Sequence, residues 1–397
     1  MSSNWLGLTW QIGFSTGWGV FGWNLALEAE REGRFRAVSF QPSVDLDWVF
    51  PRDKALLDKL LAREKSATEL LRLHPDGPCR CDFPVLHSCA NAFFEPSEME
   101  RIQGSVNLAS VFSTETEIQP AAKAKASSFS LILAGSSWCA GILRKNSITN
   151  VATFLQGVDH SIFQPRRQIQ RDRTRFFIFS GGKLEYRKGQ DIIVAAFRKF
   201  HRQHPNAMLV TNWHNAWRTW MDGIELQGHV HGKPQKNADG NLDIPAWLES
   251  NGIPRDACYD LGCIPNYQTP DVYATIDAAV FTNRCEGGTN LVAMECLACG
   301  VPTILSANTG HLDLAGDSHC YPLTKQSRPR PDPRVSGTDE WGESDVEEVV
   351  EHLERIYQQP AEAERRGAEA VQFMQSWTWK ARYQELLGHL ENLGQGR

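Results

Sequence analysis

The sequence predicts an α/β protein with two similar halves, because three stretches share one order of elements. In each stretch an apolar strand is followed by a glycine-containing loop and then by a helix with apolar residues at helical spacing. These stretches are 6–29, 176–200 and 276–299. Alternating strands and helices are typical of a parallel sheet covered by helices. At 397 residues the chain is long enough for two domains.

The composition is that of an ordinary globular protein, with 41% hydrophobic and 22% charged residues. A net charge of −6 gives no reason to expect nucleic acid or an acidic membrane as a partner. The sequence lacks an apolar run of transmembrane length and the basic, apolar start of a signal peptide. We therefore expect a cytoplasmic protein whose ten cysteines are reduced thiols.

Two groups of cysteines could in principle bind a metal ion. Cys79, Cys81, His87 and Cys89 offer four ligands within eleven residues, but their spacing is not that of a common zinc finger. The pair Cys296 and Cys299 stands inside a predicted helix, where small apolar packing is the simpler interpretation. We predict no metal site.

The stretch from Cys285 to Pro302 carries the most chemical information. An apolar run at 276–281 is expected to be a buried strand, followed by a loop that contains Gly287 and Gly288. These glycines permit positive φ and close approach by a ligand. The unit closes with Gly300, Pro302 and a further strand at 303–306.

A helix is predicted at 291–299, with Thr289 or Asn290 as its N-cap. The free N–H groups and the dipole at such a helix start favour a phosphate. Glu286 precedes the helix and Glu295 lies inside it, and both carboxylates can accept hydrogen bonds from sugar hydroxyls.

A second glycine loop follows the apolar strand at 176–180. It reads Gly-Gly-Lys-Leu-Glu-Tyr-Arg-Lys-Gly and leads into a helix that starts at Gln190. Gly182, Lys183, Arg187 and Lys188 lie in this loop. Held between a strand end and a helix start, the cations are expected to face outward.

These two loops resemble the signatures of retaining GT-B glycosyltransferases of family 4, whose usual helix motif is E-G-F-G-L-x-x-x-E-A-M-A-x-G-x-P. Eight residues separate Glu286 from Glu295, one more than in that signature. The family's first Glu therefore corresponds either to Glu286, displaced by an insertion, or to Gly287. We favour Glu286, and keep a capped surface helix as the alternative for this segment alone.

The resemblance also implies roles for the upstream loop. Its G-R-L and K-G elements supply an Arg and a Lys to the donor diphosphate in the family, and Lys183 and Lys188 occupy those positions. Lys in place of Arg keeps the charge but loses bidentate phosphate contact. The resemblance further assigns Gly288, Asn290, Leu291 and Glu295, together with Thr289, Gly182 and Arg187, to donor binding.

The first half contains weaker signals. The loop with Gly17 and Gly19 resembles the family's first loop, which approaches the donor phosphate. His87 is predicted at the end of a strand spanning 83–87, where ligands of open α/β sheets bind, so it is a catalytic candidate. A packed or capping histidine is the alternative.

The resemblance places the domain limits as well. Residues 1–165 form an acceptor-binding Rossmann-like domain, and 166–376 form a nucleotide-sugar-binding one. Residues 377–397 are a helix that crosses back to the first domain. The implied GT-B fold has two Rossmann-like domains facing each other across a cleft. Residues 165–173 are the expected linker, 325–345 a surface excursion, and the loop at Ile264 the place of the base.

The implied activity is transfer of a sugar, with retention, from a nucleotide-diphosphate sugar to a sugar, small-molecule or peptide acceptor. Lys183, Lys188, Glu286 and His87 are its catalytic candidates, and no metal or other cofactor is expected. The donor base, uridine or guanosine, stays open, as do the acceptor and the oligomeric state. The alternatives are a GT-B phosphorylase or sugar-phosphate synthase, a non-catalytic carbohydrate-binding relative and, because two carboxylates are present, a glycosidase.

Overall fold

The computed structural model describes residues 4–73, 75–166, 174–213, 215 and 218–395. The chain divides into two compact units. The first comprises Met1–Gly157, Pro265–Tyr267 and Trp377–Arg397, and the second comprises Val158–Ile264 and Gln268–Ser376. The predicted domain limits stay a prediction, and most of the predicted linker, at 167–173, lies outside the described residues.

The first unit is built on a six-stranded parallel sheet in the order β2-β1-β4-β6-β7-β8. Its strands are β1 (Trp5–Leu8), β2 (Arg36–Ser39), β4 (Val85–Cys89), β6 (Asn107–Val111), β7 (Leu131–Ala134) and β8 (Val151–Thr153). From β1 the chain moves to β2 on one side, and the later strands are added on the other side. The order of strands therefore reverses between β1 and β4, the point at which open α/β sheets bind ligands.

Helices cover this sheet. They are α1 (Gly17–Glu32), α2 (Lys54–Leu73), α3 (Ser97–Glu100), α4 (Pro120–Ala126), α5 (Ser137–Lys145) and α12 (Trp379–Gln395), and a two-stranded sheet joins β3 (Cys79–Arg80) to β5 (Ile102–Gln103). The C-terminal helix α12 packs against α1, with the Trp379 ring centroid 5.9 Å from that of Phe21. Residues at the end of the chain thus complete the core that its first residues begin.

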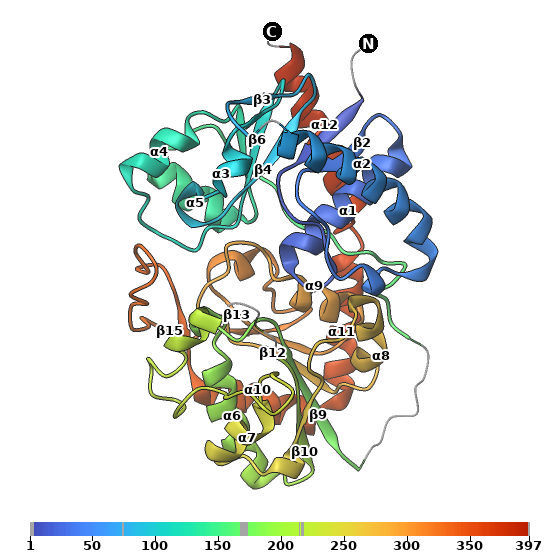
Figure 1. Cartoon of the computed structure of the whole chain (residues 1–397). Coiled ribbons are helices and arrows are strands. Elements are labelled where there is room, and N and C mark those ends of the chain that lie inside the picture. The colour runs from blue at the N-terminus through green and yellow to red at the C-terminus, as the bar shows by residue number, and fades with distance from the viewer. Residues whose placement is uncertain (1–3, 74, 167–173, 214, 216–217, 396–397) are drawn as a thin grey trace. The chain divides into compact units, whose positions relative to one another are not determined.

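The second unit repeats this plan with a sheet in the order β11-β10-β9-β12-β13-β14 (Figure 1). Its strands are β9 (Phe176–Gly181), β10 (Ala207–Asn212), β11 (Cys258–Asp260), β12 (Ala278–Phe281), β13 (Thr303–Ser306) and β14 (Tyr321–Leu323), all parallel. The strand order reverses between β9 and β12. The strands are largely buried, as the apolar runs predict, except for the edge strand β11, in which Tyr259 is exposed.

The helices of this unit are α6 (Gln190–Gln203), α7 (Ile244–Ser250), α8 (Thr269–Tyr273), α9 (Leu291–Ala298), α10 (Val346–Gln358) and α11 (Pro360–Met374). Figure 1 shows α6 and α10 beside the sheet, and the two helices contact each other. Apolar residues from them and from the sheet form one continuous core, which includes Ile193, Phe197, Leu209 and Leu353. This rigid base carries the loops at the carboxyl ends of β9 and β12.

The predicted α/β architecture with two Rossmann-like sheets is confirmed, and the differences from the sequence are local. Helix α1 begins at Gly17, inside the loop predicted to contain Gly17 and Gly19, because the Thr16 hydroxyl accepts a hydrogen bond from the Gly19 N–H at 3.1 Å.

The predicted surface excursion at 325–345 is partly wrong. Its ends pair as the antiparallel strands β15 (Gln326–Ser327) and β16 (Glu343–Ser344), and Asp332, Trp341 and Glu343 are buried. The turn-forming composition of this segment indicates a loop but does not show that the loop folds back on the unit.

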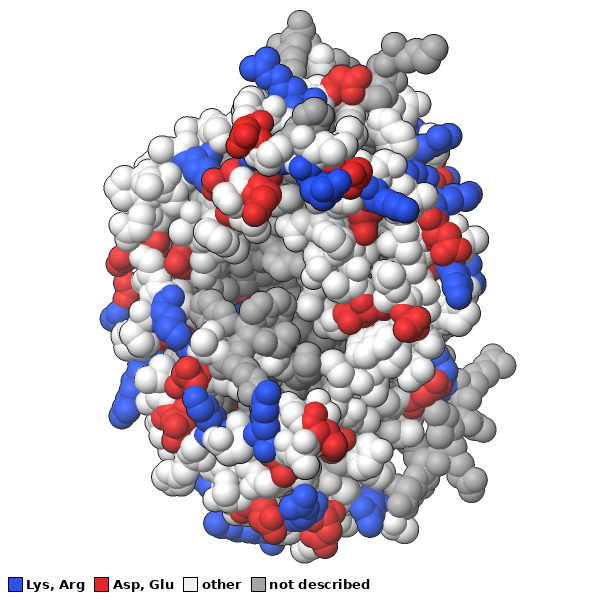
Figure 2. All heavy atoms as spheres, viewed as in Figure 1, with Lys and Arg blue, Asp and Glu red and all other residues white. Residues whose placement is uncertain are grey.

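The surface mixes charges of both signs. On the face shown in Figure 2, basic and acidic side chains of the described residues alternate without a large patch of either sign. Within the described part of the chain, no helix is long and apolar enough to cross a membrane. The prediction that nucleic acid is not a partner stays a prediction.

We predict that Gly157→Ala lowers the midpoint of thermal unfolding. A Cβ at position 157 would lie 2.5 Å from the Trp379 amide nitrogen, so the start of α12 would have to shift, at a cost of about 1–3 kcal/mol. Gly388→Ala in α12 is the control, because open space surrounds that position and alanine favours a helix. Equal midpoints for the two variants would contradict this account of α12.

Candidate functional site

The two loops singled out in the sequence leave neighbouring strands of the second unit. One loop, 182–189, follows β9, and the other, 282–290, follows β12. The two strands pair in parallel, with Ile178 opposite Ala278. Both loops therefore lie at the carboxyl edge of the sheet, where its strand order reverses and where ligands of open α/β sheets bind.

The backbones of these loops are locked together. Gly189 has φ 69°, and a Cβ there would stand 2.0 Å from the Thr282 carbonyl oxygen. The Thr282 hydroxyl donates to the Gly189 carbonyl at 2.6 Å, and the Arg284 N–H donates to the Arg187 carbonyl at 2.7 Å. Glycine at 189 is required for this close approach.

The start of α9 differs from the predicted cap. Gly287 and Gly288 do not have positive φ, whereas Asn290 adopts the left-handed region at φ 65° and stands at the N-cap without a side-chain capping bond. The Thr289 hydroxyl contacts the Met294 sulfur instead. The N–H groups of the first turn are therefore not capped by either predicted side chain, which leaves them suited to an anion.

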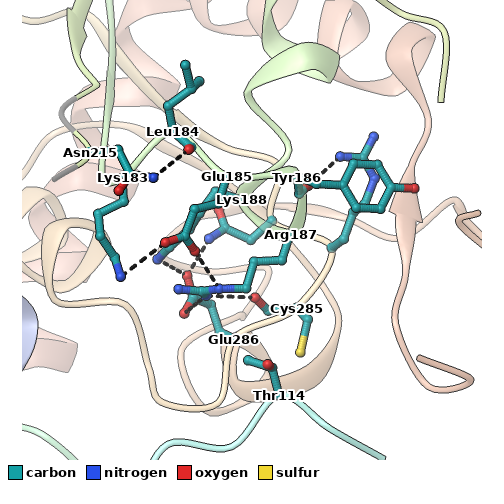
Figure 3. A network of polar contacts seen from close by, with 12 residues as sticks. Thr114, Lys183, Leu184, Glu185, Tyr186, Arg187, Lys188, Asn215, Cys285 and Glu286 are labelled. Carbon is teal, nitrogen blue, oxygen red and sulfur yellow. Dashed lines mark hydrogen bonds and ion pairs between the residues drawn. The ribbon is translucent and has the colours of Figure 1, made fainter. Parts of the chain in front are cut away.

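A chain of ion pairs joins the two loops (Figure 3). Lys183 Nζ lies 3.1 Å from Glu185 Oε1, and Arg187 Nε lies 2.8 Å from Glu185 Oε2. Arg187 Nη1 also lies 3.2 Å from Glu286 Oε2, while Lys188 Nζ pairs with Glu286 Oε1. Three cations thus meet two carboxylates, and this chain of charges carries a net positive charge.

Burial and charge act against each other in this chain. Burial disfavours the charged form of Glu286, but Lys188 and Arg187 outweigh it and hold the pKa of that carboxyl at about 2. Burial also lowers the pKa of Lys188, although Glu286 opposes this. For Glu185, Arg187 and Lys183 overcome burial and lower the pKa. Glu286 is ionised at neutral pH.

Backbone and side-chain contacts fix Glu286 in place. Its N–H donates to the Thr309 hydroxyl at 2.9 Å, its carbonyl accepts from the Gly310 N–H at 3.0 Å, and Asn283 Nδ2 donates to Oε1. A Cβ at position 310 would stand 1.9 Å from the Gly288 carbonyl oxygen, so this loop packs directly on the turn after β13. The sequence does not indicate Asn283, Thr309 or Gly310 as part of the site.

Glu295 has a different environment. It is buried on α9, and its Oε2 accepts a hydrogen bond from the Tyr273 hydroxyl of α8 at 3.3 Å. The carboxylates of Glu286 and Glu295 are thus held by separate partners.

Ile264 lies in the loop after β11 and is partly exposed. In that loop the Leu261 N–H donates to the Thr211 carbonyl at 2.8 Å, and Asn212 Nδ2 donates to the Gly262 carbonyl at 2.7 Å.

Beneath the ion chain lies a fully buried guanidinium, that of Arg284. It forms two bonds with Asp191 at 2.8 and 2.7 Å, pairs with Glu343, and donates to the Tyr186 carbonyl at 2.6 Å. It also lies 4.1 Å from the centroid of the Tyr186 ring. Because its partners lie far apart in the chain, the sequence alone gave no signal for this cluster.

His311 is a further residue that the sequence did not indicate. It is buried, and its Nε2 lies 3.1 Å from Asn290 Nδ2. Since the amide nitrogen donates, Nε2 accepts, and the neutral ring carries its proton on Nδ1. Burial lowers the pKa of His311 to about 4, against the opposing effect of Glu286. His311 therefore holds the Asn290 side chain as a neutral acceptor at physiological pH.

In the first unit, the predicted site residues have structural contacts of their own. His87 lies in the middle of β4, not at a strand end, and its ring nitrogens face Glu95 Oε1 at 2.9 Å and Asn107 Oδ1 at 3.1 Å. Gly17 is the exposed first residue of α1. A Cβ at Gly19 would stand 2.8 Å from the Gly13 backbone. The predicted location of His87 at a strand end was wrong, because β4 continues to Cys89.

The described residues contain no group of three or more His, Cys, Asp or Glu arranged to hold a metal ion. Cys79, Cys81, His87 and Cys89, the possible zinc ligands of the sequence, are therefore not arranged as a metal site. All ten cysteines are free thiols.

Known proteins resemble this chain in part of its sequence and in its whole fold. Residues 272–386, which include α9, match the model of family 4 glycosyltransferases in conflict systems. No curated protein matches the chain by sequence. The matched segment and the fold together confirm the resemblance to family 4 GT-B glycosyltransferases.

Three solved structures illustrate the fold. Sucrose-phosphate synthase from Thermosynechococcus elongatus has 16% identity and a TM-score of 0.65, covering 99% of this chain and 100% of that one. A glycosyltransferase from Rickettsia africae has 10% identity and a TM-score of 0.65, covering 99% of each chain. Anabaena HepE, solved with UDP and glucose, has 12% identity and a TM-score of 0.63, covering 98% and 99%. They confirm the predicted GT-B fold.

We predict that Lys188→Met destabilises the protein by about 3 kcal/mol at pH 7, because it removes one partner from a buried ion pair. The measurement is the urea midpoint. Lys199→Met is the control, since its pair with Glu347 is exposed and its loss should change stability by less than about 0.5 kcal/mol. A midpoint equal to that of the control would refute the buried pairing of Lys188 with Glu286.

We predict that His311 makes stability depend on pH between about 6.5 and 4. The unfolded histidine takes up a proton at its ordinary pKa, whereas the buried one does so only near 4, so stability falls as the pH falls through this range. His311→Gln should remove up to roughly 3 kcal/mol of that fall. His352, whose pKa burial also lowers, contributes equally in both proteins. Parallel curves of unfolding free energy against pH for the two proteins would contradict this.

Proposed function

We propose that this GT-B glycosyltransferase moves a sugar from a nucleotide-diphosphate sugar to an acceptor, with retention at the anomeric carbon. The observation that carries the proposal is the set of cations at the strand-order reversal of the second unit. Arg187 and Lys188 lie beside Glu286 on the carboxyl edge of β9 and β12, next to the start of α9. This combination suits a diphosphate rather than a neutral ligand.

The chemistry follows from charge. When the bond from the anomeric carbon to the diphosphate breaks, negative charge develops on the leaving oxygen, and a new bond forms to an acceptor oxygen. Lys183 and Lys188, with the N–H groups of the first turn of α9, would stabilise that charge as it develops. The Lys183 side chain is 39% exposed, so a ligand can reach it.

The carboxylates would bind hydroxyl groups of the donor. The Glu286 carboxylate has about four lone-pair sites. It accepts hydrogen bonds from Lys188, Arg187 and Asn283, so one site is left to accept from a sugar hydroxyl. Glu295, held by Tyr273, would accept from the ribose hydroxyls. Gly182 and Gly288 would allow close approach, and Ile264 would contact the base, with Thr289, Asn290 and Leu291 around the phosphate.

We infer a uridine donor. Anabaena HepE, which shares the fold, was solved with UDP-glucose at 11% identity and a TM-score of 0.61, and Staphylococcus aureus TarM was solved with UDP at 10% identity and a TM-score of 0.52. A GDP-sugar is the other candidate. The acceptor would be a sugar, small molecule or peptide bound mainly by the first unit, and the location cytoplasmic.

A sugar-phosphate synthase or phosphorylase is the second candidate, because sucrose-phosphate synthase from Thermosynechococcus elongatus shares the fold over the whole chain. Such an enzyme would take a phosphosugar or orthophosphate as acceptor. For a synthase, adding a phosphosugar to the enzyme with its nucleotide sugar should increase nucleotide release. A phosphorylase would instead move a sugar from a glycoside to orthophosphate, which yields a sugar 1-phosphate and no nucleotide. No change in nucleotide release and no sugar 1-phosphate would favour another acceptor.

We predict that UDP-glucose binding, measured by calorimetry, depends on the buried charges. Lys188→Ala and Glu295→Ala should each weaken binding roughly tenfold or more, because each removes a charge-assisted contact. Lys199→Ala, an exposed lysine on α6, is the control and should bind as the wild type does. If both variants bound UDP-glucose, GDP-mannose and UDP-N-acetylglucosamine as tightly as the control does, the proposed donor site would be wrong.

A further inference from the structure

The strand-order reversal of the first unit carries a turn whose construction is unusual. Strand β4 ends at Cys89, and residues 90–95 follow it at the carboxyl edge, beside the loop that follows β1. This is the same topological position that the ion chain occupies in the second unit. Ligands of open α/β sheets bind in the crevice at such a reversal.

The turn is fixed from three sides. Asn91 Oδ1 accepts from the Thr114 N–H at 3.1 Å. The buried ring of Phe93 stacks against Phe129 at a centroid distance of 6.5 Å.

Glu95 provides the third anchor. It is buried, and its carboxylate contacts His87 at 2.9 Å, the Thr9 hydroxyl at 3.5 Å and Lys125 at 3.4 Å. Thr9 belongs to the loop after β1, so Glu95 joins the two loops that flank the reversal. His87, predicted as a catalytic residue, thus holds this turn.

The backbone between the anchors is strained. Ala92 and Phe93 both have φ 56°, in the left-handed region that residues with a side chain rarely adopt. Three backbone hydrogen bonds close the turn: Phe93 N–H to Ala90, Phe94 N–H to Asn91, and Ala90 N–H to Phe94. The surrounding contacts therefore over-determine a conformation that this sequence would not adopt by itself.

The product of this construction is one exposed aromatic ring. Phe94 is 66% exposed, although both of its neighbours, Phe93 and Glu95, are buried. The residues around it are polar or small, since Ala92, Pro96, Ser97 and Glu98 are exposed and Asn91 is partly exposed. Within segment 91–98, Phe94 is thus the one large apolar side chain that is exposed, among small and polar residues.

We propose that Phe94 is an acceptor-binding residue that stacks on the apolar face of a sugar ring. A pyranose presents C–H groups on one face and hydroxyls at its edge, which matches a single aromatic ring with polar neighbours. A lipid chain would need a longer apolar surface, and the exposed Glu98 in the same segment disfavours a phosphorylated acceptor. This inference rests on the proposed function and names the acceptor class for that same reaction.

The test uses the full chain with four methyl glycosides as probes, those of glucose, galactose, mannose and N-acetylglucosamine. Their binding is followed by saturation-transfer NMR with and without UDP. The wild type should bind at least one of them. Phe94→Ala should weaken that binding roughly tenfold, whereas Phe94→Trp, which keeps a flat ring, should retain it.

Three controls separate the possible causes. Leu70→Ala removes another exposed apolar side chain, 58% exposed on α2, and should leave glycoside binding unchanged. The urea midpoint of Phe94→Ala should equal that of the wild type, because an exposed ring contributes little to folding. UDP affinity, measured by calorimetry, should be the same in all variants, since Phe94 belongs to the first unit.

The outcomes are distinct. Loss of glycoside binding in Phe94→Ala alone supports the inference. The inference is overturned if the wild type binds none of the glycosides, or if Phe94→Ala binds them as Leu70→Ala does. Failure of UDP to bind the wild type would instead count against the proposed function, and the glycoside results would still decide the role of Phe94.

Discussion

The buried guanidinium of Arg284 is the interaction on which the site depends. An uncompensated charge in a protein interior costs several kcal/mol, so Arg284 is tolerated only because Asp191, Glu343 and the Tyr186 carbonyl surround it. These partners come from α6, from the segment that ends at β16, and from the loop after β9. Pairing one cation therefore draws three distant segments to the carboxyl edge of the sheet. The ion chain from Lys183 to Lys188 is built on the loops that Arg284 holds.

In the proposed donor site, a carboxylate of the protein itself already pairs with the cations. Glu286 occupies Lys188 and Arg187 with a carboxylate, and its pKa of about 2 shows how strongly these cations favour negative charge. A diphosphate would bring further negative charge to cations that are already positioned, so little reorganisation is needed on binding. The first unit also has a loop at its strand-order reversal that buried polar side chains hold in place. There Glu95 and His87 fix a turn, and the turn presents an aromatic ring.

The sequence predicted the repeating elements well because they follow local patterns. The apolar run before Thr282 and the spacing after Gln190 specify β12 and α6 with little error. The resemblance to the family then located both loops. What it could not predict depends on contacts between distant segments, as with Arg284 and Glu343, or on backbone strain that only packing supports. Asn290 illustrates the second case. It stands at the N-cap of α9, as one of the two predicted caps, but its backbone is left-handed and its side chain contacts His311 instead of capping the helix.

We propose above all that the diphosphate of a nucleotide sugar binds between the loop after β9 and the start of α9. A crystal structure of the protein soaked with UDP tests this directly. We expect phosphate oxygens within hydrogen-bond distance of Lys188 and of the first N–H groups of α9, with Glu295 at the ribose. A nucleotide bound elsewhere, with Lys188 and Glu286 still paired as they are without it and no phosphate beside them, would contradict the account.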